Sequence, residues 1–305
     1  MTKRLLDCSA SDFTKMNKTN ILQSIEASEG RVLVSEIIGV FDHDFSSISC
    51  AEYAAAFGAD ILLLNVFDVF NPVFHGIPKV DKENIIKEIK RLTGRLIGIN
   101  LEPVENEQET IGEISAISKG RLATVDAAVT ANKLGADLIL LTGNPGTGVS
   151  NKAIISSLKS INAALGDKII LAAGKMHAAG SLKESGENII TKEDIKEFVN
   201  AGANIILLPA PGTVPGITME YVRELVTYAH SLGALTLTSI GTSQEDADSE
   251  TLKQIALMCK MTGTDLHHIG DAGSKSAPPE NIMNYSIAIR GKRHTFNRMA
   301  RSINR

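Results

Sequence analysis

Eight short apolar runs rich in Ile, Leu and Val recur along this chain, and their spacing constrains the fold more than any other feature. Each run is continuously apolar, which is typical of strands covered on both faces, as in parallel sheets. Their starts lie roughly 30 to 40 residues apart, at Arg31, Asp60, Arg95, Asp137, Lys168, Asn204, Leu235 and Asp265.

Segments with helical periodicity lie between these runs. The pattern predicts helices over Lys82–Thr93, Thr124–Leu134, Asn151–Leu165, Lys192–Asn200, Met219–Leu232 and Glu250–Met261. Capping residues are expected at Asp81, Ser150, Thr191, Thr218 and Ser249. Glycines that suit a left-handed helix end follow at Gly58, Gly94, Gly135, Gly202, Gly233 and Gly263.

A short motif connects helix to strand repeatedly. It reads Gly-Ala-Asp at 58–60 and 135–137, Gly-Ala-Asn at 202–204 and Gly-Thr-Asp at 263–265. Eight evenly spaced β/α units favour a closed (β/α)8 TIM barrel over an open doubly wound sheet. We therefore expect one domain over residues 1–305, with an N-terminal helical extension (1–30), the barrel (31–289) and a basic C-terminal tail (290–305) that lies in solvent.

The overall composition excludes several classes of protein. A net charge of −4 and only 4% aromatic residues argue against nucleic-acid binding. No apolar run is long enough to span a membrane, and no signal peptide is evident at the N-terminus. Three widely separated cysteines indicate a reducing compartment, so a cytoplasmic location is expected. We also expect no membrane partner and assembly as a homo-oligomer.

The segments that follow the strands are long and polar, whereas those that precede the strands are short. In a parallel barrel all strand exits share the face where barrel enzymes place their active sites. Glycine-rich exits can present backbone N–H groups to phosphate, which predicts a small phosphorylated substrate. The candidate phosphate-binding residues are Gly241, Thr242, Ser243, Gly270, Gly273 and Ser274; the alternative is that they only form tight turns.

Four residues at or near strand exits are candidates for catalysis. Lys175 directly follows a strand, where it would form a Schiff base, stabilise an enolate or bind phosphate, and His177 follows two residues later. One residue of the pair His267–His268 should face the barrel interior, and His268 is the candidate acid or base. Glu36 interrupts an apolar strand, and a buried carboxylate needs a partner. A surface lysine and a histidine bound to backbone are the structural alternatives.

Carboxylates at the strand exits are candidate metal ligands. Asp42, Asp44, Glu102 and Asp271 would suit Mg²⁺ in a site for a phosphorylated or enolising substrate, although no two of them have a diagnostic spacing. No nucleotide cofactor is predicted.

Some fragments resemble motifs of known families. Three fragments resemble motifs of the haloacid dehalogenase superfamily: Asp42-His43-Asp44-Phe45-Ser46, Leu140–Asn144 and Ile269-Gly270-Asp271. This resemblance implies that Asp42 is a nucleophile and Asp44 an acid/base. It also implies that Lys175 binds phosphate and that Asp271 is a magnesium ligand. Over nearly its whole length the chain resembles a bacterial barrel family often labelled phosphonomutase-like or dehalogenase-like. That resemblance rests on LLTGNPGTG, LPAPGTVPG, TSIGTSQEDAD and HHIGDAG.

Three functions remain open on these grounds. The leading hypothesis is an enzyme that acts on a small phosphorylated metabolite, as a lyase, aldolase or isomerase. The second is a phosphohydrolase that uses Asp42. The third is a protein of a sugar-uptake system that binds a phosphorylated ligand without turnover.

Overall fold

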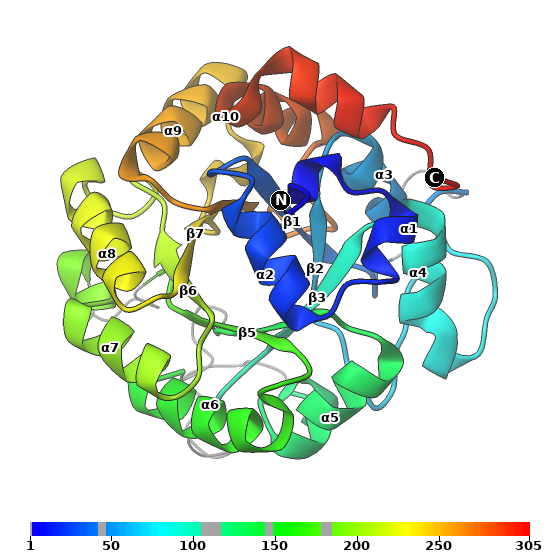
Figure 1. Cartoon of the computed structure of the whole chain (residues 1–305), viewed down its shortest axis with the longest axis horizontal. Coiled ribbons are helices and arrows are strands. Elements are labelled where there is room, and N and C mark those ends of the chain that lie inside the picture. Colours follow the sequence, from blue (N-terminus) through cyan, green and yellow to red (C-terminus); the bar gives the residue numbers. More distant parts are fainter. Residues whose placement is uncertain (1, 42–46, 105–116, 144–148, 178–184) are drawn as a thin grey trace.

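The chain forms a closed barrel of eight parallel strands, in which each strand pairs with its neighbours in sequence and β8 pairs with β1 (Figure 1). The structure is a computed structural model that describes residues 2–41, 47–104, 117–143, 149–177 and 185–305. The strands are β1 Val32–Ile38, β2 Ile61–Asn65, β3 Leu96–Leu101, β4 Leu138–Leu141, β5 Ile170–Gly174, β6 Ile205–Pro209, β7 Leu235–Ile240 and β8 Leu266–Ile269. The predicted (β/α)8 barrel is confirmed.

Helices surround the barrel and cover the outer face of every strand (Figure 1). The α-helices of the described residues are α1 Ala10–Phe13, α2 Lys18–Glu26, α3 Cys50–Ala56, α4 Ile85–Thr93, α5 Val125–Leu134, α6 Asn151–Leu165, α7 Lys192–Asn200, α8 Met219–Ser231, α9 Ser249–Thr262 and α10 Pro279–Met299, and those from α3 on form the surrounding layer. None of the helices in the described ranges is long and apolar enough to cross a membrane.

Most of the predicted helix ends are confirmed, and two caps are wrong. Ser150, Thr191 and Thr218 each accept a hydrogen bond from a backbone N–H of the first turn. Asp81 makes no such bond and precedes a short 3-10 turn. The cap of α9 is Asp248 and not Ser249, because the Asp248 carboxylate accepts two backbone hydrogen bonds.

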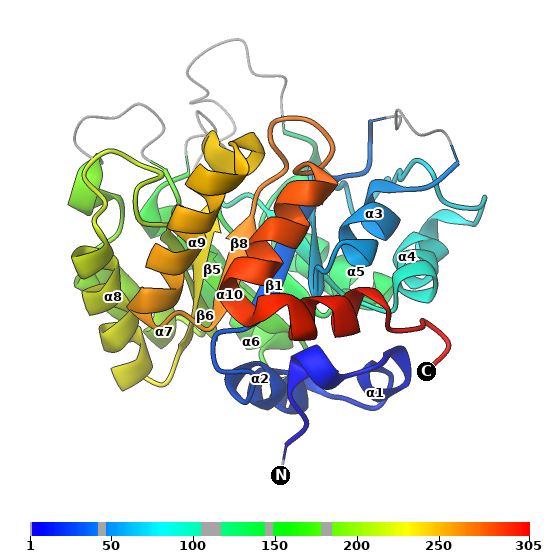
Figure 2. The ribbon, with the colours of Figure 1, turned by 90° about the horizontal axis from the view of Figure 1, so that it is seen from above.

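The N-terminal extension closes the end of the barrel at which the strands begin. Figure 2 shows α1 and α2 below the strands, on the side opposite the strand exits. Leu5, Ile21 and Ile25 are buried and pack in one cluster with interior residues of the barrel such as Val32 and Leu96. The extension therefore serves as an apolar plug, and the opposite end of the barrel is left for a site.

The Gly-Ala-Asp motif has a structural role in the barrel. The last residue of each motif copy lies directly before an even-numbered strand; these residues are Asp60, Asp137, Asn204 and Asp265. Each side chain accepts a hydrogen bond from a backbone N–H of the preceding odd-numbered strand at 2.7 to 3.0 Å. The backbone N–H of each of these residues donates to the carbonyl of the same neighbour. The motif therefore joins the strands in pairs at the end where they begin.

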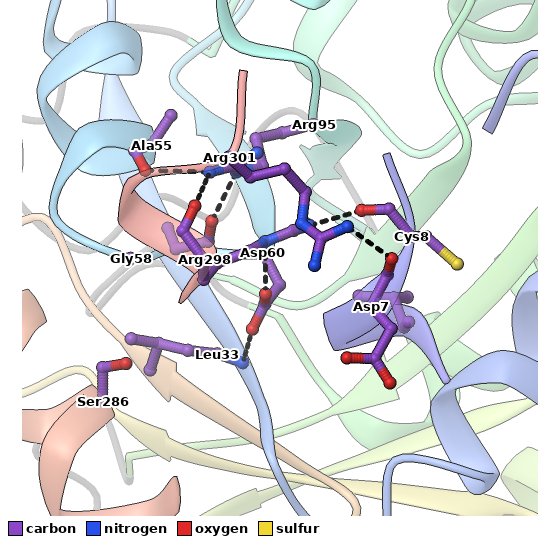
Figure 3. Close-up of polar contacts among 12 residues, drawn as sticks. Asp7, Cys8, Leu33, Ala55, Gly58, Asp60, Arg95, Ser286, Arg298 and Arg301 are labelled. Atoms are coloured by element: carbon purple, nitrogen blue, oxygen red, sulfur yellow. Dashed lines mark hydrogen bonds and ion pairs between the residues drawn. The ribbon is translucent and has the colours of Figure 1, made fainter. Parts of the chain in front are cut away.

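The C-terminal segment is not a solvated tail, contrary to the prediction. Helix α10 continues past a kink at Gly291 and packs against the lower edge of the barrel (Figure 2). The side chains of Arg290 and Arg298 are fully buried, and both form ion pairs with the buried Asp60 carboxylate. Figure 3 shows this cluster, in which Arg95 also lies close to Arg298 and donates to its carbonyl. A carboxylate and backbone carbonyls thus compensate guanidinium groups that the sequence alone placed in solvent.

Candidate active site

Polar side chains form one ring inside the barrel, at the exit ends of the strands. Along β1 the inward positions are Val32, Val34 and then Glu36, so a carboxylate follows two apolar residues. The same change from apolar to polar occurs on five more strands. The ring consists of Glu36, Asn65, Asn100, Thr142, Ser239 and His268, all 6% exposed or less.

Glu36, His268 and Ser239 form a connected chain in this ring. The Nε2 atom of His268 lies 3.3 Å from a carboxylate oxygen of Glu36. Its Nδ1 atom lies 2.7 Å from the Ser239 hydroxyl, which also lies 3.3 Å from the sulfur of Met176. Burial raises the pKa of Glu36 above its ordinary value, and His268 partly opposes that shift. A carboxyl group with a raised pKa beside an imidazole is typical of sites that transfer protons.

The neighbouring His267 has a different environment. Its ring faces the helix layer, where Nε2 lies 3.1 Å from the carbonyl of Gly30 and the ring packs edge-on against Tyr285. Burial lowers the pKa of His267 to about 4, so this imidazole is neutral and structural. Of the histidine pair, the inward residue is His268, which is the one selected from the sequence.

Asn65 organises the opposite side of the ring. Its amide nitrogen donates to Asp271 at 3.0 Å, and its amide oxygen accepts from Asn100 and from the backbone N–H of Val66. Val66 has a φ of +55°, a conformation that costs a β-branched residue roughly 1–3 kcal/mol. Such strain is common where a structure fixes a functional side chain, here Asn65.

A small cavity of about 40 Å³ lies at the centre of the ring. Thr142 Oγ1 and Asn100 Oδ1 are buried beside it and have no hydrogen-bond partner within the described part of the chain. Glu245, which follows β7, also lines the cavity, and burial raises its pKa. Because buried polar groups in folded proteins are usually hydrogen-bonded, to protein or to ordered water, these atoms give the cavity a polar lining.

Lys175 and His177 lie at the end of β5, and only one of them reaches the cavity. His177 lines it, whereas Lys175 does not, because Met176 continues the inward row of this strand. Lys175 is nevertheless only 7% exposed. Burial, and then the charge of Lys175, lower the pKa of His177, so its imidazole is neutral at pH 7.

Two of the glycines selected as phosphate ligands, Gly241 and Gly270, lie where a larger residue would clash with a neighbouring side chain. A Cβ on Gly241 would lie 2.1 Å from the Met176 sulfur, and one on Gly270 would lie 2.8 Å from Glu245. The N–H groups of Gly270, Gly273 and Ser274 donate to Ile240, to the Asp271 side chain and to the Asp271 carbonyl. These three donors are occupied within the protein, which does not favour them as phosphate ligands.

Of the other two candidates, Thr242 and Ser243, the Thr242 hydroxyl donates to the carbonyl of Thr213 at 3.1 Å. Both residues lie at the rim beyond β7. Thr242 and Ser243, at the rim of the barrel after β7, therefore stay the predicted phosphate site.

Two of the carboxylates selected as metal ligands, Glu102 and Asp271, are described, and they have different partners. Glu102 forms a buried ion pair with Arg121, and Asp271 accepts from Asn65 and Gly273. Asp42 and Asp44 lie outside the described residues. Within the described ranges, no three His, Cys, Asp or Glu side chains are placed to hold a metal ion. Glu102 and Asp271 are therefore engaged with protein partners, and the predicted Mg²⁺ site stays a prediction.

The sequence analysis missed several residues of the ring. Asn65, Asn100, Thr142 and Ser239 are neutral polar residues at the ends of apolar runs, and Glu245 lies in a loop. Counting alternate residues from the inward apolar positions of each strand would have found the first four, because side chains in a strand alternate between faces. Nothing in the local sequence distinguishes Glu245 from a solvated acid.

A family model matches residues 6–305, almost the whole chain. The chain belongs to the family described as Domain of unknown function (DUF7916). No curated protein matches this sequence.

Two solved structures have a similar fold. An archaeal fructose 1,6-bisphosphate aldolase has a TM-score of 0.56 and 14% identity, over 90% of this chain and 99% of the aldolase. A putative phosphonomutase from Burkholderia cenocepacia J2315 has a TM-score of 0.51 and 16% identity, over 83% of this chain and 92% of that one. At these identities the likeness concerns the fold alone, and it agrees with the barrel described above.

Proposed function

We propose that this member of the DUF7916 family is an enzyme that transfers protons on a small phosphorylated metabolite, as a lyase, aldolase or isomerase. The observation that carries the proposal is the buried pair of Glu36 and His268 beside a cavity that contains unsatisfied polar atoms. A carboxyl group with a raised pKa next to an imidazole is a common arrangement for general acid–base catalysis. The interior of such a barrel is otherwise filled mainly by branched apolar side chains.

The hydrogen bonds define two proton arrangements of this pair. If the Ser239 hydroxyl donates to Met176, it accepts from His268 Nδ1–H, and the bare Nε2 faces a protonated Glu36. If Ser239 donates to Nδ1 instead, Nε2–H faces an ionised Glu36. The first arrangement makes Glu36 an acid and the second makes it a base. Ser239 is therefore a positioning residue that permits both states.

The size of the cavity limits what reaches the acid. A cavity needs roughly 10–15 Å³ to hold one water molecule, so about 40 Å³ admits only the reacting end of a substrate. The Thr142 hydroxyl and the Asn100 carbonyl are placed to hold its oxygen or hydroxyl groups. The phosphate would lie outside, near Thr242, Ser243 and Lys175. The aldolase and the putative phosphonomutase of similar fold support this substrate class by their names alone.

A screen by phosphorus NMR tests the proposal. The wild-type chain is mixed with phosphorylated sugars, aldehydes and keto acids, and we expect one class to be converted. Glu36→Gln should lower that rate about 10²–10⁴-fold, the usual contribution of a general acid or base. Ser239→Ala should shift the pH profile of the reaction. Glu88→Gln, on the outer helix α4, is the matched control and should retain full activity.

Two results would contradict this scheme. Tight binding of a phosphorylated compound without conversion would indicate a non-catalytic binding protein. A covalent adduct on Lys175 after borohydride treatment would indicate imine chemistry, for which the position of this lysine outside the cavity gives no support.

A further inference from the structure

A second and much larger cavity lies at the opposite end of the barrel, where the strands begin. Its volume is about 510 Å³, within the range of roughly 300–1,000 Å³ that is usual for small-molecule sites. It is enclosed by α1, by α4 with the start of β3, and by the last residues of the chain. Figures 1 and 2 show these three segments near one another on the same side of the molecule, at the right of both views.

The walls of this cavity are apolar on one side. Phe13 of α1, Leu96 of β3 and Ile303 near the C-terminus contribute to it. The Ile303 side chain is 40% exposed, so part of its apolar surface is in contact with water. These residues present a surface on which an apolar group would be removed from water.

The charged side chains that line the cavity are all of one sign. Five of the described lining residues are Lys or Arg and none is Asp or Glu. Lys90 and Arg91 have carboxylate partners on nearby segments. Lys87 contacts only the neutral Asn84 side chain among the described residues, so its charge remains available to an anion.

Arg95 is the buried charged group of this site. It is 5% exposed, and its guanidinium donates to the carbonyls of Ala59, Ala55 and Arg298 at 2.7 to 3.2 Å. No carboxylate of the described residues forms an ion pair with it. Burial and the neighbouring Arg298 therefore lower the pKa of Arg95 well below its ordinary value.

The interior behind the cavity has an excess of positive charge. Arg95, Arg290 and Arg298 are all 5% exposed or less, and Asp60 is the carboxylate that pairs with Arg290 and Arg298. Figure 3 shows Arg95, Arg298 and Asp60 close together. A buried charge without a counter-charge is costly, and an anion near Arg95 would offset part of that cost. The cavity is the place from which an anion can approach Arg95.

We propose that this cavity binds an amphipathic anion, a carboxylate or phosphate group on a short apolar chain. The head group lies toward Arg95 and Lys87, and the chain lies against Phe13, Leu96 and Ile303. The site is independent of the proposed enzymatic activity, because it lies at the other end of the barrel.

Thermal shift and calorimetry on the full chain test the proposal with four probes. Octanoate and octyl phosphate should raise the melting temperature saturably, since a ligand that binds only the folded state stabilises it. Octanol, which lacks the charge, and inorganic phosphate, which lacks the chain, should not. A response to only one of the two amphiphiles identifies the head group and supports the site.

Variants on the exposed face of α4 locate the binding. Lys87→Gln combined with Arg91→Gln should weaken octanoate binding about tenfold, because two cations are removed. Lys192→Gln combined with Arg223→Gln, on α7 and α8, removes a similar pair far from the cavity and should change nothing. Circular dichroism confirms that each variant is folded.

Two results would overturn the proposal. One is an equal affinity for octanoate in the α4 variant, the α7/α8 variant and the wild type. The other is a concentration-dependent dimer that Ile303→Ser abolishes, because the cavity would then be covered by a second copy of the chain.

Discussion

Replacing Asp60 by Asn should destabilise the fold much more than the same change at Asp137. The two residues occupy equivalent places in the Gly-Ala-Asp motif, and each accepts a backbone N–H at 2.8 Å. Asn204 makes the same contact in a third copy of the motif, so an amide preserves this hydrogen bond. The comparison therefore isolates the charge of each carboxylate.

The magnitude follows from burial. The partners of Asp60 are the fully buried Arg290 and Arg298, and breaking a buried ion pair costs about 3–5 kcal/mol because a charge is left uncompensated. The partner of Asp137 is Lys90, whose side chain is 31% exposed, and a pair of this kind contributes about 1 kcal/mol or less. Water can solvate the lysine after the change.

Urea unfolding followed by far-ultraviolet circular dichroism measures the difference, since the chain has no tryptophan. With a slope of about 3 kcal/mol per molar urea, Asp60→Asn should lower the midpoint by about 1–1.7 M, and Asp137→Asn by about 0.3 M or less. Equal midpoints for the two variants would refute the account of the buried arginines.

Three further changes have expected outcomes. Because burial raises the pKa of Glu36, its contribution to stability is lost as pH rises above the ordinary value of 4.5 toward the raised one, so Glu36→Gln should flatten the fall in melting temperature above pH 4.5; an unchanged slope would contradict the raised pKa. Gly174→Ala places a Cβ 2.1 Å from the carbonyl oxygen of Leu207 and should cost at least about 3 kcal/mol in urea unfolding, whereas Gly273→Ala, with nothing within 4 Å, should cost about 1 kcal/mol from its backbone conformation alone. Thr191→Ala removes the cap of α7 and should lower the unfolding free energy by about 1 kcal/mol, so no loss would show that the cap is not stabilising.

The barrel could be predicted because its signals are local. Continuous apolar runs, helix caps and the Gly-Ala-Asp motif each report on a few neighbouring residues, and eight repeats leave little choice of fold. The cap at Asp248 was missed because the adjacent Ser249 is an equally good capping residue, and only the backbone geometry distinguishes them.

The site could be predicted only in part, because it depends on contacts between distant segments. Glu36 and His268 were found since a charged or titratable residue inside an apolar run is conspicuous. The charge of Lys175 suggested catalysis, but the alternation of β5 places Met176 and not Lys175 in the cavity. The burial of Arg298 depends on Asp60, more than 200 residues earlier, and no local pattern contains that information.

Hydrogen–deuterium exchange at carbon tests the central proposal most directly, because it detects proton transfer even without net conversion. The chain is incubated in deuterated water with small phosphorylated carbonyl compounds, and proton NMR follows the C–H signals next to the carbonyl. The account predicts exchange catalysed by the wild type and by Glu88→Gln, and loss of that exchange in Glu36→Gln. Undiminished exchange in Glu36→Gln, or binding of these compounds by the wild type with no exchange, would contradict it.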